Sequence, residues 1–460
     1  MLYPHRQEDW IMLKDCRGLE LTTCSARTVT AFDHAIDGYL AYRADTAARL
    51  DALLALDPEF GMAHCLKGYL LMMAFRADLL PAARKASIDA RHGMADGTPR
   101  EKAHAGALDA WTAGHPEQAV AVWTMILRDH PHDILALRLA HFLDFWLGRP
   151  KAMLAAVLAV DRHWSPALPG YTAVLGCRCF AHEEAGFYSE AEQAGRQAIN
   201  LDPTDLWAAH GVAHVLEMTG RPAEGITWVE TLQSRWDDGN NLKHHLWWHQ
   251  AMYHLEQGEM AKVLSLYEAG FRDLAAPLTD AAPDLYIDVQ NAASMLFRLG
   301  RHGVDVGDRW VELADKAEAR IGDCLSAFTL PHWMMALAAT GREAAARAML
   351  SAMRDFARSP DPIPSLVRRV ALPVTEAVLA NAQGRHAEAV ALMRPILPEM
   401  HRMGGSHAQQ DVLEQVFLDA ALKAGADADV RMLLAQVTGR HPVPPSRRRG
   451  YSMGARLLAA

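Results

Sequence analysis

The sequence predicts an all-α protein, built as one array of helix pairs, and three observations lead to this fold class. Residues that lose little freedom in a helix, such as Ala, Leu, Met, Glu and Arg, dominate many segments. Runs of alternating Val, Ile, Thr and Tyr, which are typical of strands, are nearly absent. The chain has 460 residues, well above the roughly 100–200 of one compact domain, so internal repeats are sought first.

A short sequence motif recurs, in which an apolar helix end is followed by a glycine and then by an Ala-rich helix. Gly114, Gly148, Gly186 and Gly220 follow one another at spacings of 34, 38 and 34 residues. Later copies lie 38 to 43 residues apart, at Gly258, Gly300, Gly341 and Gly384. A glycine can take the left-handed conformation that ends a helix. The period near 34 is that of tetratricopeptide (TPR) units, so we expect a TPR-like α-solenoid, a superhelix of about nine to eleven antiparallel helix pairs.

The helix pairs are predicted to form one domain. Pro58, Pro131 and Pro203 mark places where second helices stop and the next pair begins. The Ala- and Pro-rich stretch 275–283 is the best candidate boundary and is interpreted as an inter-helix loop. We therefore expect one domain over residues 1–440, with an atypical N-terminal cap over about residues 1–30, and a Pro/Arg-containing tail over 441–460. The arginines 447–449 are interpreted as solvated residues before a last short helix.

Composition argues against several classes of function. The net charge of −9 is wrong for a general nucleic-acid binder, which needs a basic face. The segment Met1–Trp10 lacks a signal-peptide pattern, and no run reaches the roughly 18 apolar residues that span a bilayer. Six scattered cysteines indicate a reducing compartment. The sequence thus predicts a soluble cytoplasmic protein that binds neither nucleic acid nor membrane, and it leaves the oligomeric state open.

The first helix of each predicted pair is expected to line the concave groove of the superhelix, and two neighbouring first helices carry the same polar pattern. Counting back from Gly220 places Trp207, His210, His214 and Glu217 on one stripe facing the concave groove. In the next first helix, the stripe holds His245, His249, Met252 and Glu256. Each helix therefore has a His-x3-His pair followed by a carboxylate. Residues four apart on a helix are neighbours, close enough for one ion to bridge two imidazoles.

Three interpretations of this pattern compete. In the first, His210, His214, His245 and His249 bind a Zn-like divalent metal, with Glu217 as ligand or base. The His-Glu-x-x-His order of known zinc proteases is absent. In the second, the histidines form a metal-free site between Trp walls, which include Trp248, where they do acid–base work or bind an anionic or polar ligand; the expected partner in the groove is a small polar molecule or peptide. In the third, the histidines are structural and fix the superhelix by hydrogen bonds.

The same counting places other polar side chains in the groove. Four complete the predicted ligand-binding set, namely Glu184, Asp288, Asn291 and His332. Others are interpreted as interior polar groups, namely His104, His141 and Cys177. Ser406 with Gln409 matches a capping box, and the preceding Gly404-Gly405 could alternatively form an anion-binding nest.

Longer motifs run from about Ala31 to the region of Leu434. They are Thr98-Pro99-Arg100-Glu101 with His104; His141 with Phe145 and Trp146; Glu184 with Phe187-Tyr188; Pro203-Thr204-Asp205 with Trp207; His210, His214, Glu217 and Met218; His245, Trp248 and His249; Ser294-Met295-Leu296 with Arg298-Leu299; His332; and Gly404-Gly405-Ser406 with Ala408, Gln409 and Asp411. In these motifs the chain resembles the tetratricopeptide repeat protein 38 family. The resemblance implies a TPR-like fold and a soluble cytoplasmic protein, without a settled reaction. Asn291 stands where the family is expected to carry Asp, which weakens an enzyme interpretation if that Asp is a ligand or base.

The preferred hypothesis is a pocket enclosed between the helices over residues 207–217 and 245–256. It binds a small polar molecule, and it extends to acid–base or hydrolytic chemistry by His210, His214, Glu217 and His249. Trp207, Trp248 and His245 complete the predicted ligand contacts. The alternative is a non-catalytic protein–protein interaction scaffold in which the same histidines are structural.

Overall fold

The fold is described by a computed structural model that covers residues 12–459. The segment Met1–Trp10, for which the sequence predicts no signal peptide, lies outside the described residues. Within them, the regular secondary structure is helical except for an isolated bridge between Arg43 and Gly239 and one short antiparallel hairpin, in which β1 (Leu13–Lys14) pairs with β2 (Glu20–Leu21). The predicted all-α class is therefore confirmed. No helix in this part of the chain combines the length and the apolarity needed to cross a membrane.

The helices follow one another with short connections throughout. The first third contains α1 (Ala26–Leu40), α2 (Thr46–Leu56), α3 (Gly61–Met73), α4 (Leu80–Gly93), α5 (Pro99–Thr112), α6 (Pro116–Asp129), α7 (Ile134–Trp146) and α8 (Pro150–Asp161). The middle contains α9 (Tyr171–Glu184), α10 (Tyr188–Leu201), α11 (Leu206–Met218), α12 (Pro222–Leu232), α13 (Leu242–Gln257), α14 (Met260–Leu266), α15 (Pro277–Ala281) and α16 (Tyr286–Arg301).

The last third contains α17 (Arg309–Ala319), α18 (Thr329–Ala339), α19 (Glu343–Phe356), α20 (Pro362–Leu366), α21 (Leu372–Ala382), α22 (His386–Met393), α23 (His407–Lys423), α24 (Asp427–Arg440) and α25 (Ser452–Ala459). Short 3₁₀ turns are η1 (Ala77–Leu79), η2 (Gln233–Arg235), η5 (Leu397–Met403) and η6 (Pro445–Arg447). Two π-helical turns are η3 (Tyr267–Phe271) and η4 (Val367–Ala371).

Glycines end the first helices as the repeat predicts, with one exception. A positive φ, the left-handed conformation, is found at Gly114, Gly148, Gly186, Gly220, Gly258, Gly341 and Gly384. The prediction is wrong for Gly300, because α16 continues through Arg301 and the left-handed residue is Gly303. Several second helices then begin with a proline, whose missing N–H costs nothing at the first helical position.

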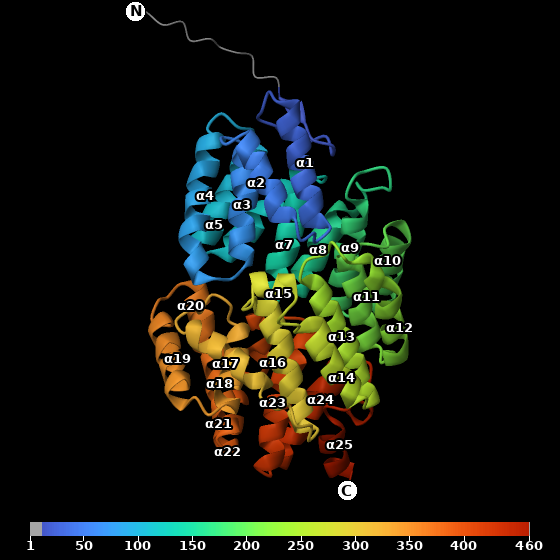
Figure 1. Cartoon of the computed structure of the whole chain (residues 1–460), viewed down its shortest axis with the longest axis vertical. Coiled ribbons are helices and arrows are strands. Elements are labelled where there is room, and N and C mark those ends of the chain that lie inside the picture. Colours follow the sequence, from blue (N-terminus) through green and yellow to red (C-terminus); the bar gives the residue numbers. More distant parts are fainter. Residues whose placement is uncertain (1–11, 460) are drawn as a thin grey trace, which may run out of the picture.

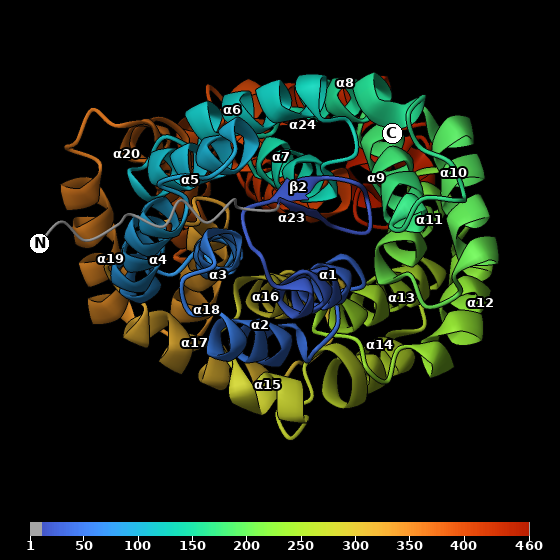
Figure 2. The same ribbon diagram turned by 90° about the horizontal axis from the view of Figure 1, so that it is seen from above.

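The helices wind into a ring (Figure 1, Figure 2). Seen from above, α1 at the N-terminal end lies over the level of α13 and α16, so the ring returns on itself (Figure 2). Backbone hydrogen bonds join these distant segments, because Ala44 N–H donates to the Asp238 carbonyl (2.9 Å) and Asn240 N–H donates to the Tyr42 carbonyl (2.7 Å). Helix α23 packs against α11, α16 and α21 and so fills the interior of the lower half.

The predicted cap at the start of α23 is present. Ser406 Oγ accepts from Gln409 N–H (3.2 Å), and Gln409 Oε1 accepts from Ser406 N–H (3.1 Å). The second left-handed glycine before it, Gly405, lies against Phe328, where a Cβ would stand 2.8 Å from the ring. The interpretation as a helix cap is therefore confirmed.

The C-terminal arginines correct one expectation. Arg448 forms an ion pair with Asp411 (2.6 Å), and the fully buried Tyr451 donates its hydroxyl to the same carboxylate (2.7 Å). The Arg449 N–H donates to Glu256 (2.9 Å). The interpretation of this run as solvated is therefore wrong at Arg448 and Arg449, because acidic groups of distant helices supply partners that local sequence does not reveal. The predicted last short helix is α25.

Candidate functional site

Helices α11 and α13 hold the candidate site. Asp205 caps α11 by accepting from the Ala208 N–H (2.9 Å). The buried Tyr253 of α13 donates its hydroxyl to the Ala213 carbonyl of α11 (2.6 Å), which fixes one helix against the other. Small residues on α11, such as Gly211, allow close approach to α9, because a Cβ there would stand 2.6 Å from the Cys179 sulfur. The inner stripes of the two helices therefore face each other.

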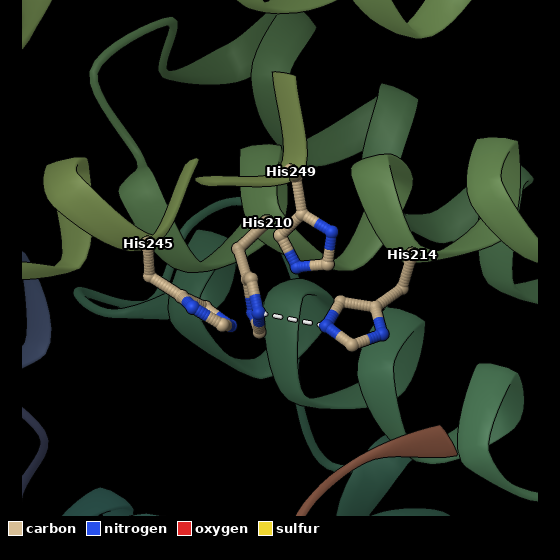
Figure 3. Close-up of side chains that lie close together, drawn as sticks. All are labelled: His210, His214, His245 and His249. Atoms are coloured by element: carbon tan, nitrogen blue, oxygen red, sulfur yellow. Dashed lines mark hydrogen bonds between the residues drawn. The ribbon is translucent and has the colours of Figure 1, made fainter. Parts of the chain in front are cut away.

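Four imidazoles meet between these helices (Figure 3). Candidate ligand atoms of His210, His214, His245 and His249 all lie within 4.8 Å of one another, and every one of these residues is buried. The Nε2 atoms of His210 and His214 are 2.9 Å apart. The rings of His214 and His249, on different helices, have centroids 4.4 Å apart. The structure thus brings together both predicted His-x3-His pairs, here called the four-histidine cluster.

Two of these histidines form a hydrogen bond through Nδ1 to an acceptor that lies outside the cluster. His249 Nδ1 lies 2.8 Å from a Glu217 carboxylate oxygen, and His245 Nδ1 lies 2.8 Å from the Asn291 amide oxygen. Because both oxygens accept, each Nδ1 carries the proton and each Nε2 keeps a free lone pair. His249 Nε2 has no hydrogen-bond partner among the described residues. This is the arrangement in which histidines are oriented as metal ligands.

A third outer contact comes from a residue that sequence reasoning missed. The fully buried Glu183 places a carboxylate oxygen 3.7 Å from His214 Nδ1. Counting positions within the repeat instead predicted its neighbour Glu184, which lies 3.9 Å from His407 Nδ1. Candidate ligand atoms of Glu183, Glu184 and His214 nevertheless lie within 4.8 Å of one another. The sequence did carry a signal that could have identified Glu183, because Glu183 and Glu184 form an adjacent acidic pair at the end of the inner helix α9.

Burial determines the protonation of the cluster. It lowers the pKa of His249 to about 3. Burial, followed by the neighbouring imidazoles, holds the pKa of the other three histidines well below the ordinary value. Burial also raises the pKa of Glu217 to about 7. The histidines are therefore neutral at physiological pH, which is the form that binds metal.

Of the remaining predicted residues, two touch the cluster and two do not. Trp248 stacks on His245 (centroids 5.1 Å, planes 10° apart), and Trp207 contacts His210 (4.9 Å). Asp288 lies 3.5 Å from His244 Nδ1, outside the cluster. His332 uses its Nδ1 on the Phe328 carbonyl within its own helix α18 (2.8 Å). Asp288 and His332 therefore do not belong to the four-histidine cluster.

A cavity of about 280 Å³ opens beside the cluster, and His210 and His245 form part of its wall. Aromatic side chains form the largest group in the remaining wall, with contributions from Tyr39, Tyr42, Phe142, Phe145, Trp146, Trp207 and Tyr286. Its polar groups are few and include Arg138, His141, Asn240 and Asn241. Here it is called the aromatic cavity. A second cavity of about 500 Å³ lies beyond Glu184 and His407, and none of the four histidines lines it.

Arg138 is the second residue that sequence reasoning missed. The signal was present, since Arg138 is the one Arg or Lys in the stretch Ile134–Leu143, whose other residues are apolar except His141, three positions further on. Tyr42, in the turn after α1, and Tyr286, at the start of α16, reach the cavity from segments far away in sequence, and no local pattern marks them.

No protein-family model matches the chain. The resemblance to the tetratricopeptide repeat protein 38 family therefore stays a prediction. The chemistry of the donors is clear from the residues themselves: four neutral imidazoles suit Zn²⁺, Fe²⁺, Ni²⁺ and Cu²⁺.

Proposed function

We propose that the chain is a metal-dependent enzyme in which the four-histidine cluster binds one divalent transition-metal ion at the wall of the aromatic cavity. One observation carries this proposal: four buried imidazoles converge within 4.8 Å while outer acceptors hold Nδ1 of His245 and His249. Buried polar atoms normally have partners. Here His249 Nε2 lacks one among the described residues, and the Nε2 atoms of His210 and His214 have only each other as partners. A metal ion would give these converging nitrogens a shared partner and would replace the hydrogen bond between His210 and His214.

The spacing of the nitrogens favours an ion with positions left open. With metal–nitrogen bonds of about 2.1 Å, ligands at right angles lie about 3.0 Å apart, and ligands at the tetrahedral angle lie about 3.4 Å apart. The 2.9 Å between Nε2 of His210 and of His214 matches the right angle. If the ion were six-coordinate, four protein ligands would leave two positions. Because His210 and His245 line the aromatic cavity, we place the open positions on that side.

The reaction class we propose is metal-assisted hydrolysis of a small molecule. Among residues 12–459, the wall of the aromatic cavity has no Asp, Glu, Lys or Cys. Its one aliphatic hydroxyl, on Ser406, is engaged in the helix cap. Besides the imidazoles, the cavity therefore lacks a side chain suited to be nucleophile or base, and burial, followed by the Arg138 charge, makes His141 a weak base by holding its pKa well below the usual value. A bound ion would supply both Lewis acidity and an activated water. Glu217 then acts by holding His249 and balancing charge.

The test is elemental analysis by mass spectrometry on untagged protein purified without chelators. We expect about one equivalent of metal per chain, lost in His210→Ala and in His249→Ala. His34→Ala is the matched control, because His34 is exposed on α1, and it should keep the metal. Cobalt-substituted protein should show the weak visible absorption of six coordination, whereas intense bands would indicate a closed tetrahedral site. Folded protein that neither contains metal nor binds added Fe²⁺, Co²⁺, Ni²⁺ or Zn²⁺ would sink the proposal.

The same proposal includes the TPR-like superhelix, supported by the repeated glycine turns and the ring of helix pairs. Its ligand is a small molecule in the aromatic cavity, and we expect no nucleic-acid or membrane partner. A cytoplasmic location stays a prediction. If the cluster binds no metal, the alternative of a protein-interaction scaffold with structural histidines takes its place.

A further inference from the structure

Arg138 is a buried cation without an acidic partner. Its side chain lies in the wall of the aromatic cavity, and the residue is 4% exposed. Its guanidinium donates to the Tyr42 hydroxyl (2.5 Å) and to the Cys177 sulfur (3.3 Å), and its Nε has no partner. Among residues 12–459, no Asp or Glu oxygen forms an ion pair with it. A buried charge normally has an opposite charge beside it, because desolvation is costly.

Other buried arginines of this chain follow that rule. Arg100 pairs with Asp133 at 2.8 Å, and Arg298 pairs with Asp411 at 3.3 Å. Arg138 also lies near the Tyr42 and Trp207 rings, with its Cζ 5.2 and 5.1 Å from their centroids. Such cation–π contacts stabilise the guanidinium, but the rings carry no net charge. The positive charge is therefore left for a ligand to balance.

Polar atoms next to Arg138 are also without partners. Both ring nitrogens of the buried His141 and the hydroxyl of Tyr39 lack a hydrogen bond among the described residues. These side chains line the same cavity as Arg138. A guanidinium, an imidazole and a phenol together offer donors in the number that a carboxylate accepts.

Trp207 connects this polar end of the cavity to the metal end. The centroid of its ring lies 5.1 Å from the Arg138 Cζ and 4.9 Å from the centroid of the His210 ring. It also stacks with Tyr42 at 5.6 Å, with planes 18° apart. A ligand held at Arg138 and reaching the four-histidine cluster must therefore lie along aromatic surface.

We infer that the aromatic cavity takes a small aromatic carboxylic acid, with its carboxylate on Arg138 and its ring along Trp207. This substrate class rests on the proposed function of the four-histidine cluster. With Arg138 and a divalent ion on a wall free of acidic side chains, the cavity has an excess of positive charge that an anion offsets. The hydrolysed bond would lie at the end of the molecule opposite the carboxylate, next to His210 and His245.

The experiment measures binding of three acids and their amides to the full-length protein. Benzoate, phenylacetate and 3-phenylpropionate are compared with benzamide, phenylacetamide and 3-phenylpropionamide by calorimetry and tryptophan fluorescence. We expect at least one acid to bind tenfold or more tightly than its amide. Arg138→Gln should bring that ratio close to one, and Arg138→Lys should keep part of it, because a lysine retains charge without the planar fork.

The comparison in the wild-type protein decides the matter even if Arg138→Gln fails to fold. Equal affinity for acid and amide in every pair, or no binding of any probe, overturns the inference, as does an unchanged ratio in a folded Arg138→Gln protein. Metal content is measured on the same preparations. Metal without a carboxylate preference sinks this inference alone, whereas a carboxylate preference in protein that cannot bind metal sinks the proposed function alone.

Discussion

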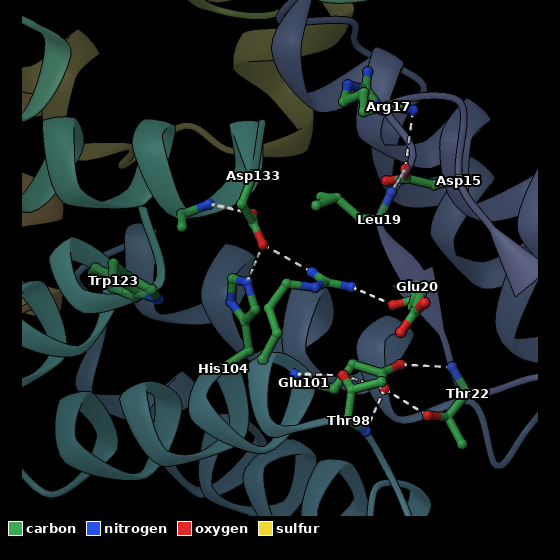
Figure 4. Close-up of polar contacts among 12 residues, drawn as sticks. Asp15, Arg17, Leu19, Glu20, Thr22, Thr98, Glu101, His104, Trp123 and Asp133 are labelled. Carbon is green, nitrogen blue, oxygen red and sulfur yellow. Dashed lines mark hydrogen bonds and ion pairs between the residues drawn. The ribbon is translucent and has the colours of Figure 1, made fainter. Parts of the chain in front are cut away.

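The chain contains two sets of buried histidines on inner helices, and they are built in opposite ways. On α5, His104 places Nε2 3.1 Å from Asp133 and Nδ1 3.2 Å from the Tyr69 hydroxyl. Asp133 also accepts from Arg100 (2.8 Å) and from the Ala136 N–H that it caps (3.0 Å) (Figure 4). We call these residues the His104 network. In the four-histidine cluster, by contrast, three ring nitrogens lack partners among the described residues.

The difference separates a stabilising site from a binding site. In the His104 network every charge has a partner, and the pKa of Asp133 lies below its ordinary value because His104 and Arg100 outweigh the effect of burial. Satisfied polar networks of this kind rigidify a fold. The four-histidine cluster leaves polar atoms unpaired beside a cavity, which reduces stability and makes sense only when a ligand completes it.

The motif around His104 therefore has a structural explanation. Thr98 and Glu101 form a capping box at the start of α5, and Glu101 also accepts from the backbone N–H of Thr22 (2.9 Å) (Figure 4). These contacts attach the N-terminal hairpin to α5. The resemblance pattern thus mixes residues that hold the fold with residues that form the candidate site, and only the contacts tell them apart.

The largest expected effect is on the stability of the His104 network. Asp133→Asn should keep the helix cap but leave Arg100 buried without its counterion, lowering the free energy of unfolding by about 3–5 kcal/mol. Asp205→Asn is the matched control, because Asp205 caps α11 in the same way without any arginine within ion-pair distance among the described residues. We expect it to cost about 1 kcal/mol or less. Urea unfolding measures both, and equal losses would contradict a special role for the ion pair.

Metal removal should give the next largest effect. With free metal at about 100 to 1,000 times its dissociation constant, the bound ion stabilises the protein by about 2.7–4.1 kcal/mol. A chelator should therefore lower the melting temperature of the wild-type protein. The same chelator should leave His210→Ala unchanged, and metal-free His210→Ala should melt below metal-free wild type only by the cost of the lost imidazole packing and of its 2.9 Å contact to His214. A steep loss of stability in metal-free His210→Ala would assign the cluster a structural role instead.

Sequence reasoning succeeded where a helix face alone decides the outcome. The 3.6-residue period places His210 with His214, and the repeat makes α11 and α13 neighbours, so the convergence of their histidines was predictable. It failed where distant segments meet. Tyr42 reaches the aromatic cavity because the ring closes through the loop at Asn240, and neither segment carries a local signal of that closure.

The outer acceptors should have a moderate effect on metal affinity. Asn291→Leu removes the oxygen 2.8 Å from His245 Nδ1 and should weaken metal binding about 10–100-fold. Asn291→Asp supplies an anionic acceptor, makes His245 a more basic ligand, and should bind metal at least as tightly as wild type. Competition with a chelating dye measures both variants. Because the resembled family is expected to carry Asp here, weaker binding by Asn291→Asp than by Asn291→Leu would show that this acceptor is not oriented toward His245 as described.

The smallest expected effect is a pH dependence of the free energy of unfolding that is caused by His332. This residue is intermediate between the His104 network and the four-histidine cluster. Its Nδ1 is satisfied by the Phe328 carbonyl, and burial lowers its pKa to about 4. An unfolded chain takes up the proton near pH 6.5, whereas the folded chain resists it until about pH 4. Unfolding therefore takes up a proton between these values, and stability falls as the pH falls.

This single group should cost about 1 kcal/mol between pH 7 and pH 5.5. The measurement is urea unfolding of the wild type and of His332→Gln at both pH values, because other buried histidines titrate in both proteins and cancel in the difference. We expect the wild type to lose about 1 kcal/mol more than the variant over this interval. Equal losses of stability in the two proteins would mean that His332 titrates normally in the folded chain. One hydrogen-bonded ring nitrogen would then not be enough to make a buried histidine part of a stabilising network.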